Sequence, residues 1–501
     1  MKFVKSIALL LVSFTSFSQI DQEARFEILL SENDIHENYS VSSLADQGLL
    51  VYRRLFGQRE DQLELIKLDT TLIENWRGYI ALQKKLQVSH VKVHDQVVFI
   101  LLKSGNYTSG DFQVVAIKAD DGTYKVYTIK NLIPFNPTDF IVTSYGMMLG
   151  GYFNYRPLVL YFSFQTERSK ILPGLFNEQG ELTQIKPYDN GFVDVIISAK
   201  NFERKKCLWI RNYDAEADLV KTTVLAPEAN KNLIFGRSVK MPNDEEVVAG
   251  VYGNRNVEYS RGIFVANINR LGEYHITYYN FSELQNFFSY MKVRREKRVK
   301  ERIERRKIKG KKIRFNYRLL VQEVIPYENQ FIMLGEAFYP RYTYTGTRGN
   351  SFGFSSFYSN PLTRGDRIFD GYQYTHAIVI GFDAQGKLKW DNSFEINDVK
   401  SFDLQQYVKI APSKNQISLV YFYDNLIRSK IIKDNQVLEG KTADPLKSRF
   451  ETDLIKKNDT QTSKLDYWYA HHFFASGIQK VRNQQVEDLY RKVFFINKIK
   501  Y

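Results

Sequence analysis

The sequence predicts an all-β fold, a β-propeller with eight blades, and two observations lead to this prediction. Pairs of apolar strands joined by short polar turns recur along the chain. The first strands of successive pairs begin 45 to 56 residues apart, except in two longer intervals of 84 and 86 residues. A repeat of this length is typical of the four-stranded blade of a propeller.

Eight apolar segments mark the first strands of the repeat, beginning at Gly48, Val97, Met147, Phe192, Val247, Phe331, Ile417 and Phe473. Without insertions, eight units have about 50 residues each and seven would have about 57. Eight blades are therefore favoured, and seven are the alternative. The 33 Tyr and 36 Phe suggest an outer-membrane β-barrel as a further alternative. Segments such as 97–102 are apolar on consecutive positions, whereas lipid-facing strands alternate more strictly, so the propeller is preferred.

The two ends of the chain predict how the ring closes. The eighth unit stops at its second strand, 493–501, and so lacks an outer strand. A strand at 26–30 belongs to no other unit. Because an unpaired strand edge is a liability, we expect these two segments to pair and to complete the eighth blade.

The amino terminus has the pattern of an export signal. Lys2 and Lys5 precede the apolar run 7–12, and serines occupy the two positions that a signal peptidase reads. We therefore expect residues 1–18 to be a signal peptide, and the protein to work in the periplasm or outer cell envelope of a Gram-negative bacterium. No later segment is apolar enough to predict a transmembrane helix.

Residues with catalytic or metal-binding potential are scattered. Cys207 is the single cysteine, which excludes a disulfide framework. His90 and His94 share a strand face but lie about 13 Å apart, too far for one metal ion. The neighbours His471 and His472 point to opposite faces of a strand. The sequence thus predicts no metal, no cofactor and, on balance, no enzymatic activity.

A first insertion, 282–314, is predicted to be helical. Ser282 and Gln285 have the spacing of a capping box. The side chains that follow at helical spacing predict a stripe that packs on the body of the protein: Leu284, Phe287, Phe288 and Met291.

The second half of this insertion is strongly basic. Residues 292–314 contain fourteen Lys and Arg against three Glu, a net charge of +11, whereas the whole chain carries +14. The candidate binding residues are Arg294, Arg295, Lys297, Arg298, Arg302, Arg305 and Arg306. Such a cluster favours an anionic partner: lipid head groups, lipopolysaccharide phosphates or an acidic envelope protein. Export argues against nucleic acid. The alternative is a solvated helix that only spaces two blades.

Two further insertions interrupt the repeat. Residues 341–375 combine nine Phe and Tyr with Gly, Ser, Asn and Thr, a composition typical of binding loops. Its candidate contact residues are Tyr342, Tyr344, Phe352, Phe354, Phe357 and Tyr358. The alternative is an apolar lid over one face of the propeller. Residues 441–464 are predicted to form a charged tether.

One hairpin carries a resemblance to a known family. In the segment 382–390, Asp383, Gly386 and Trp390 resemble the Asp, Gly, Trp hairpin of quinoprotein-like eight-bladed propellers, and 120–122 and 269–272 match it in part. The resemblance implies the fold. The cofactor residues of the redox members have no counterpart in this chain, so quinone chemistry is not expected. Non-enzymatic members, such as the propeller scaffold of the outer-membrane barrel assembly machinery, are the better analogy.

These observations lead to a functional hypothesis. We expect an exported, non-enzymatic propeller scaffold that binds a protein partner or the cell envelope. A glycan-binding or hydrolytic propeller, with its site in the central funnel, is the alternative.

Overall fold

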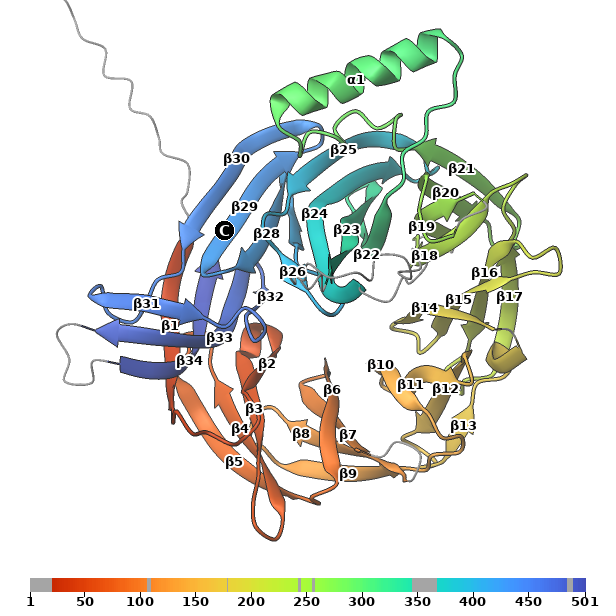
Figure 1. Cartoon of the computed structure of the whole chain (residues 1–501). Helices are drawn as coiled ribbons and strands as arrows, with labels where there is room; N and C mark the ends of the chain where they lie inside the picture. Colours follow the sequence, from red (N-terminus) through yellow and green to blue (C-terminus); the bar gives the residue numbers. More distant parts are fainter. Residues whose placement is uncertain are drawn as a thin grey trace, which may run out of the picture.

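The protein is an eight-bladed β-propeller (Figure 1). The computed structural model describes residues 20–105, 110–177, 179–241, 245–254, 257–344, 367–483 and 490–501. Within them the strands form eight separate sheets of four or five strands, arranged in a ring. The repeat therefore predicted both the fold and the number of blades. The predicted signal peptide, 1–18, lies outside the described residues.

The first four blades each contain four strands, which follow one another from the inside of the ring outward. They are β2 (Ser40–Ser43), β3 (Leu49–Leu55), β4 (Asp61–Leu68) and β5 (Glu74–Leu82); β6 (Leu86–His94), β7 (Val97–Ser104), β8 (Phe112–Lys118) and β9 (Tyr124–Ile129); β10 (Asn136–Val142), β11 (Gly146–Phe153), β12 (Arg156–Ser163) and β13 (Ser169–Ile171); and β14 (Gly180–Pro187), β15 (Val193–Lys200), β16 (Lys206–Tyr213) and β17 (Leu219–Leu225).

The fifth to seventh blades follow the same plan, and the sixth has a short extra strand, β26. They are β18 (Asn232–Lys240), β19 (Glu246–Gly253), β20 (Gly262–Ile268) and β21 (Tyr274–Asn280); β22 (Arg318–Tyr327), β23 (Gln330–Tyr344), β24 (Arg367–Asp383), β25 (Leu388–Glu395) and β26 (Lys400–Ser401); and β27 (Lys409–Ser413), β28 (Gln416–Tyr423), β29 (Leu426–Lys433) and β30 (Gln436–Pro445). The turns between second and third strands and the connections between blades share one side of the ring, which we call the connector face.

The eighth blade is assembled from both ends of the chain. It contains β31 (Asp453–Asn458), β32 (Lys464–Tyr469), β33 (His472–Asn483), β34 (Tyr490–Lys500) and, as its outer strand, β1 (Asp21–Leu30). β1 runs antiparallel to β34, so that Phe26 lies opposite Ile496. The guanidinium of Arg25 donates to Asn497 Oδ1 and to Gln479 Oε1, both at 2.8 Å. The predicted closure is confirmed.

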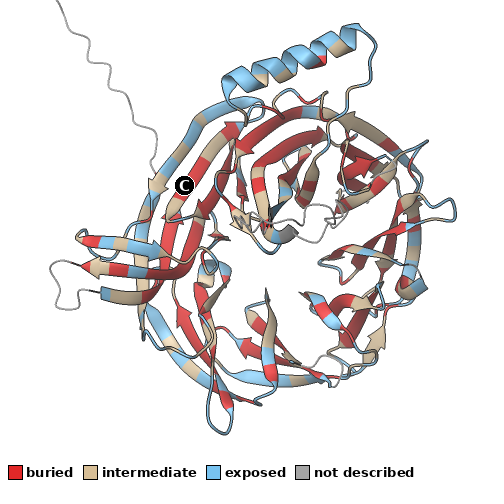
Figure 2. Ribbon diagram, in the orientation of Figure 1, coloured by how far each residue is buried: buried red, intermediate tan, exposed pale blue. Residues whose placement is uncertain are grey.

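The hydrophobic core lies between neighbouring blades (Figure 2). All eight residues of β19 are buried, because both faces of its sheet are covered by other sheets. This explains why the middle strands are apolar on consecutive positions rather than on alternate ones.

The resemblance hairpin is the turn between β24 and β25. Asp383 Oδ1 accepts the backbone N–H of Lys387 at 2.8 Å, and Gly386 has a φ of 74°, in the left-handed region that favours glycine. Trp390 is buried and its Nε1 donates to Gln330 Oε1 at 3.0 Å. The turn is therefore a structural element of the sixth blade.

The helix prediction was wrong about where the helix begins. α1 (Val293–Ile308) starts eleven residues after Ser282, and residues 281–292 form turns. Asp391 of β25 accepts the backbone N–H groups of Gln285 and Asn286 at 2.8 and 2.7 Å, so these donors bond to a neighbouring blade. The predicted packing is confirmed, because Leu284, Phe287 and Phe288 are buried and Met291, which is partly buried, packs against the same cluster.

The prediction that 441–464 forms a charged tether also needs correction, because much of this segment is β-strand. Its first residues belong to β30, and β31 pairs with β33 inside the eighth blade. Asp453 is buried, where it forms an ion pair with Arg491 and accepts from Asn483 Nδ2 at 2.6 Å. The segment looked like a solvated tether because most of its charged residues are exposed at the edge of the blade, and the buried pairing of Asp453 is with a residue outside it.

In the part of the chain that the structure describes, no helix is long and apolar enough to cross a membrane.

Candidate functional site

α1 lies on the rim of the ring, in the connection between the fifth and sixth blades (Figure 1). Its one buried residue is Ile303, which is 5% exposed. Ile303 packs into the cluster between these two blades, and Val299 lies partly buried beside it. Ile303 is therefore the residue that anchors α1 to the ring.

The predicted basic residues are accessible on α1. Arg294, Arg295, Lys297, Arg298, Arg302 and Arg305 are exposed, and Arg306 is half-buried. Nine residues, or 2.5 helical turns, separate Arg294 from Ile303, which places them on opposite faces of α1. Lys300 pairs with Glu296 at 2.7 Å, and Lys307 pairs with Glu304 at 3.3 Å. The three glutamates cannot neutralise the fourteen cations, so the rim carries a concentrated positive charge.

Part of the aromatic insertion extends the second and third strands of the sixth blade. Tyr342 is 50% exposed and lies opposite Phe369 on β24. Phe369 contacts Tyr372 and Phe402, with ring centroids 4.9 and 6.3 Å apart. Phe402, from the connection after β25, was missed because the segment 396–408 lacks the aromatic, Gly and Ser composition of a binding loop. Tyr342, Phe369 and Phe402 are partly exposed, and most of the segment on which the lid alternative depends, 345–366, lies outside the described residues.

The other predicted aromatic residues belong to the end of β23 and to the segment that follows it. The backbone of Tyr344 pairs with Arg367 at the end of β23. Phe352, Phe354, Phe357 and Tyr358 lie outside the described residues.

The two insertions meet around a pocket of about 420 Å³ on the connector face. Tyr290 and Tyr317, which flank α1 in sequence, line it together with Tyr339 and Tyr342 of β23. The Tyr290 and Tyr317 hydroxyls are 3.2 Å apart, and burial raises the pKa of both phenols. These groups therefore stay protonated and act as hydrogen-bonding groups at neutral pH.

His376 supports this pocket from behind. Its ring is buried and stacks on Tyr290 with a centroid distance of 3.7 Å. Burial lowers the pKa of His376 to about 3, so the imidazole is neutral at physiological pH. We assign it a packing role.

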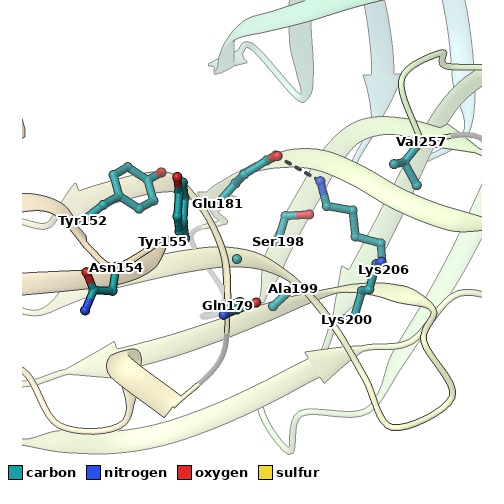
Figure 3. A pocket seen from close by; sticks show the side chains of 11 residues that line it. Tyr152, Asn154, Tyr155, Gln179, Glu181, Ser198, Ala199, Lys200, Lys206 and Val257 are labelled. Carbon is teal, nitrogen blue, oxygen red and sulfur yellow. Dashed lines mark hydrogen bonds and ion pairs between the residues drawn. The ribbon is translucent and has the colours of Figure 1, made fainter.

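A second pocket, of about 1010 Å³, lies on the connector face between the third and fourth blades (Figure 3). Tyr152, Asn154 and Tyr155 come from the end of β11 and the turn after it. The opposite side is formed by Gln179, Glu181, Lys200 and Lys206 around the fourth blade, and Val257 of the fifth blade completes the lining. Lys206 Nζ lies 3.0 Å from Glu181 Oε2. No sequence motif indicated this site, because its parts come from separate segments.

A buried charged cluster joins the fourth and fifth blades. Asp194 accepts from the Tyr188 hydroxyl at 2.6 Å and lies 3.7 Å from Lys240 Nζ. Burial, together with the charge of Asp194, raises the pKa of Glu246 above its ordinary value. Asp194 and Glu246 resemble an acid and base pair, but both are buried from solvent, so we assign them to blade packing.

The histidines considered from sequence make separate local contacts. His90 Nε2 lies 3.2 Å from the Thr138 carbonyl oxygen, and His94 Nε2 lies 3.1 Å from Ser144 Oγ. Among the described residues, no three His, Cys, Asp or Glu side chains gather as metal ligands would.

Comparisons with known proteins do not assign the chain to a family. No protein-family model and no curated protein matches the chain. Solved structures similar to it include the dihydro-heme d1 dehydrogenase NirN, with a TM-score of 0.42, 9% identity, and coverage of 96% of this chain and 79% of that one. The polysaccharide lyase Uly1 has a TM-score of 0.40, 8% identity and coverages of 82% and 89%. A prolyl endopeptidase has a TM-score of 0.40 and 8% identity; the match covers 90% of this chain but only 55% of that one.

Proposed function

We propose that this protein is an exported, non-enzymatic propeller scaffold that docks on an anionic surface of the cell envelope through α1. The observation that carries the proposal is the placement of α1: Ile303 is buried against the blades, while six of the seven predicted cations are exposed. A helix that only spaced two blades would not need fourteen cations in and around it.

The energetics favour a surface of phosphate groups. A Lys or Arg near an anionic membrane surface contributes on the order of 1 kcal/mol, so several cations acting together give firm binding. Helical periodicity places Arg294, Arg298 and Arg305 on the side of α1 away from Ile303. These cations can reach lipid head groups or lipopolysaccharide phosphates without moving the ring. The aromatic residues Tyr342, Phe369 and Phe402 offer an additional contact.

The experiment compares two variants that lose the same charge. In the first, Arg294, Arg295, Arg298, Arg302, Arg305 and Arg306 become Gln. In the control, the exposed residues Arg59, Lys118, Lys130, Lys387, Lys414 and Lys457 become Gln. Sedimentation with phosphatidylglycerol vesicles at low salt is expected to show binding by the wild type and the control, and loss of binding by the α1 variant.

Salt provides a further check. Binding should weaken as the salt concentration rises, because the Debye length shrinks from about 10 Å at 0.1 M to about 3 Å at 1 M. Absence of wild-type binding at low salt, or equal binding by the two six-fold variants, would contradict docking through α1.

Export is tested separately. Fractionation of the native cells should recover the protein in the envelope, and amino-terminal sequencing should begin at Gln19. Recovery in the cytoplasm with an intact amino terminus would refute this part of the proposal.

A further inference from the structure

We infer that the pocket between the third and fourth blades (Figure 3) binds a neutral saccharide. This site is separate from α1 and does not depend on docking. The inference rests on a strained, exposed tyrosine and on the hydrogen-bonding groups that surround it.

Tyr155 occupies a backbone conformation that its side chain does not favour. Asn154 and Tyr155 form the tight turn between β11 and β12, with φ angles of 48° and 60°. Turns with two positive φ angles favour Asn followed by Gly, because glycine has no Cβ. In the described part of the chain, Tyr155 is the one aromatic residue with a positive φ.

Packing does not explain why this turn contains an aromatic ring. Tyr155 is 86% exposed, so burial of the ring does not compensate for the backbone strain. Leu72, the other large apolar residue with a positive φ, is buried in the core. Backbone strain without compensating burial is typical of binding sites. Tyr155 therefore presents its ring to a ligand.

The groups around the ring can both donate and accept hydrogen bonds. Glu181 provides a carboxylate, and Lys206 holds one of its oxygens at 3.0 Å while the Glu181 side chain remains 64% exposed. Gln179 and Asn154 add amide groups, which donate and accept, and Lys200 adds an ammonium. Tyr152 is fixed in place because its hydroxyl accepts the backbone N–H of Leu182 at 2.8 Å.

A saccharide matches this arrangement. A pyranose ring has an apolar face of C–H groups, which can lie on Tyr155, and a rim of hydroxyls that both donate and accept. The Glu181 carboxylate repels an anionic ligand near the centre of the site, where its pairing with Lys206 leaves no net charge, and Lys200 is the remaining cation of the lining. These features favour a neutral saccharide over a uronic acid polymer or a nucleotide.

The test uses the full mature chain and isothermal titration with cellohexaose, xylohexaose, mannohexaose, chitohexaose and hexagalacturonate. We expect at least one neutral hexasaccharide to bind, and binding to be insensitive to salt. Tyr155→Ala should weaken it at least about tenfold, which corresponds to about 1.4 kcal/mol. The matched control is Phe202→Ala, because Phe202 is fully exposed on the neighbouring turn and does not line the pocket.

Tyr155→Gly separates binding from folding. Glycine relieves the strained backbone, so this variant should lose saccharide binding while its melting temperature stays the same or rises. The inference is overturned if no neutral hexasaccharide binds at millimolar concentration, if hexagalacturonate binds more tightly than all of them, or if Tyr155→Ala binds as the wild type does.

Discussion

The carboxylate of Asp391 accepts the backbone N–H of Asn286 at 2.7 Å, although the two residues lie 105 positions apart. A second contact runs in the same direction, from the side-chain amide of Asn286 to the carbonyl oxygen of Asp391 at 2.9 Å. One residue of β25 therefore holds the turns that lead into α1.

Removing this carboxylate should release the connection. Asp391→Ala leaves the N–H groups of Gln285 and Asn286 without their acceptor, and we expect a loss of about 2 to 4 kcal/mol in the free energy of unfolding. Denaturant titration measures this loss, and hydrogen exchange should accelerate in 284–292. Asp403→Ala, at an exposed aspartate, is the control and should change stability by less than about 0.5 kcal/mol.

Two isoleucines of α1 provide a matched pair. Ile303 is buried, whereas Ile308 is 84% exposed. Ile303→Ser should detach α1 from the blades, so that its amides exchange faster and vesicle binding weakens, because ordering the helix then costs conformational entropy. Ile308→Ser should leave both properties unchanged. Equal exchange rates in the two variants would show that Ile303 is not the anchor.

Neighbouring residues of β1 test the closure of the ring. Ile28 packs against the core and Leu29 is 69% exposed, because adjacent side chains point to opposite faces of a strand. Ile28→Lys places a charge against this core and should cost about 2 kcal/mol or more. Leu29→Lys should cost less than about 0.5 kcal/mol. Thermal melting of the two variants gives the comparison, and similar melting temperatures would argue against a stabilising role for β1.

Glu336 should make stability depend on pH. Burial raises the pKa of Glu336 from its ordinary 4.5 to about 7, although the backbone N–H groups of Val408 and Tyr407 oppose the rise. Between these two pH values the folded chain holds a proton that the unfolded chain releases. The contribution, on the order of 3 kcal/mol, is therefore complete below pH 4.5 and lost as the pH rises through 7.

Substitution of Glu336 by Gln removes this titration. Denaturant titrations at pH 5 and pH 8 should show that Glu336→Gln loses much less stability between the two values than the wild type. Some dependence of stability on pH should remain, because burial also raises the pKa of Glu246. Exposed Glu60→Gln should keep the wild-type dependence. A wild-type stability that rises from pH 5 to pH 8 would contradict the assigned direction.

The sequence predicted the ring because the relevant signal is local and repeated. Each blade needs apolar middle strands, and the same pattern therefore recurs every 50 residues or so. The exposed cations of α1 were predictable for a similar reason, since a dense run of Lys and Arg can hardly be buried without partners.

Features that depend on distant partners were not predictable. No helix begins at the capping box of Ser282, because Asp391 of another segment accepts the backbone N–H of Gln285. The segment predicted as a tether contains Asp453, whose partner Arg491 lies in another strand. The pocket around Tyr155 escaped notice because Glu181 and Lys206 meet it only through the packing of neighbouring blades. The spacing of residues within one segment carries no information about such contacts.

The pairing of β1 with β34 also has a consequence for biosynthesis. β1 is among the first strands to leave the ribosome, and β34 is synthesised after all the other strands of the ring. Until then β1 has no partner strand, because β34 is its neighbour in the eighth blade. A nascent chain is thus exposed to aggregation for nearly its whole synthesis, and a holding chaperone bound to the early blades would protect it until the last strand arrives.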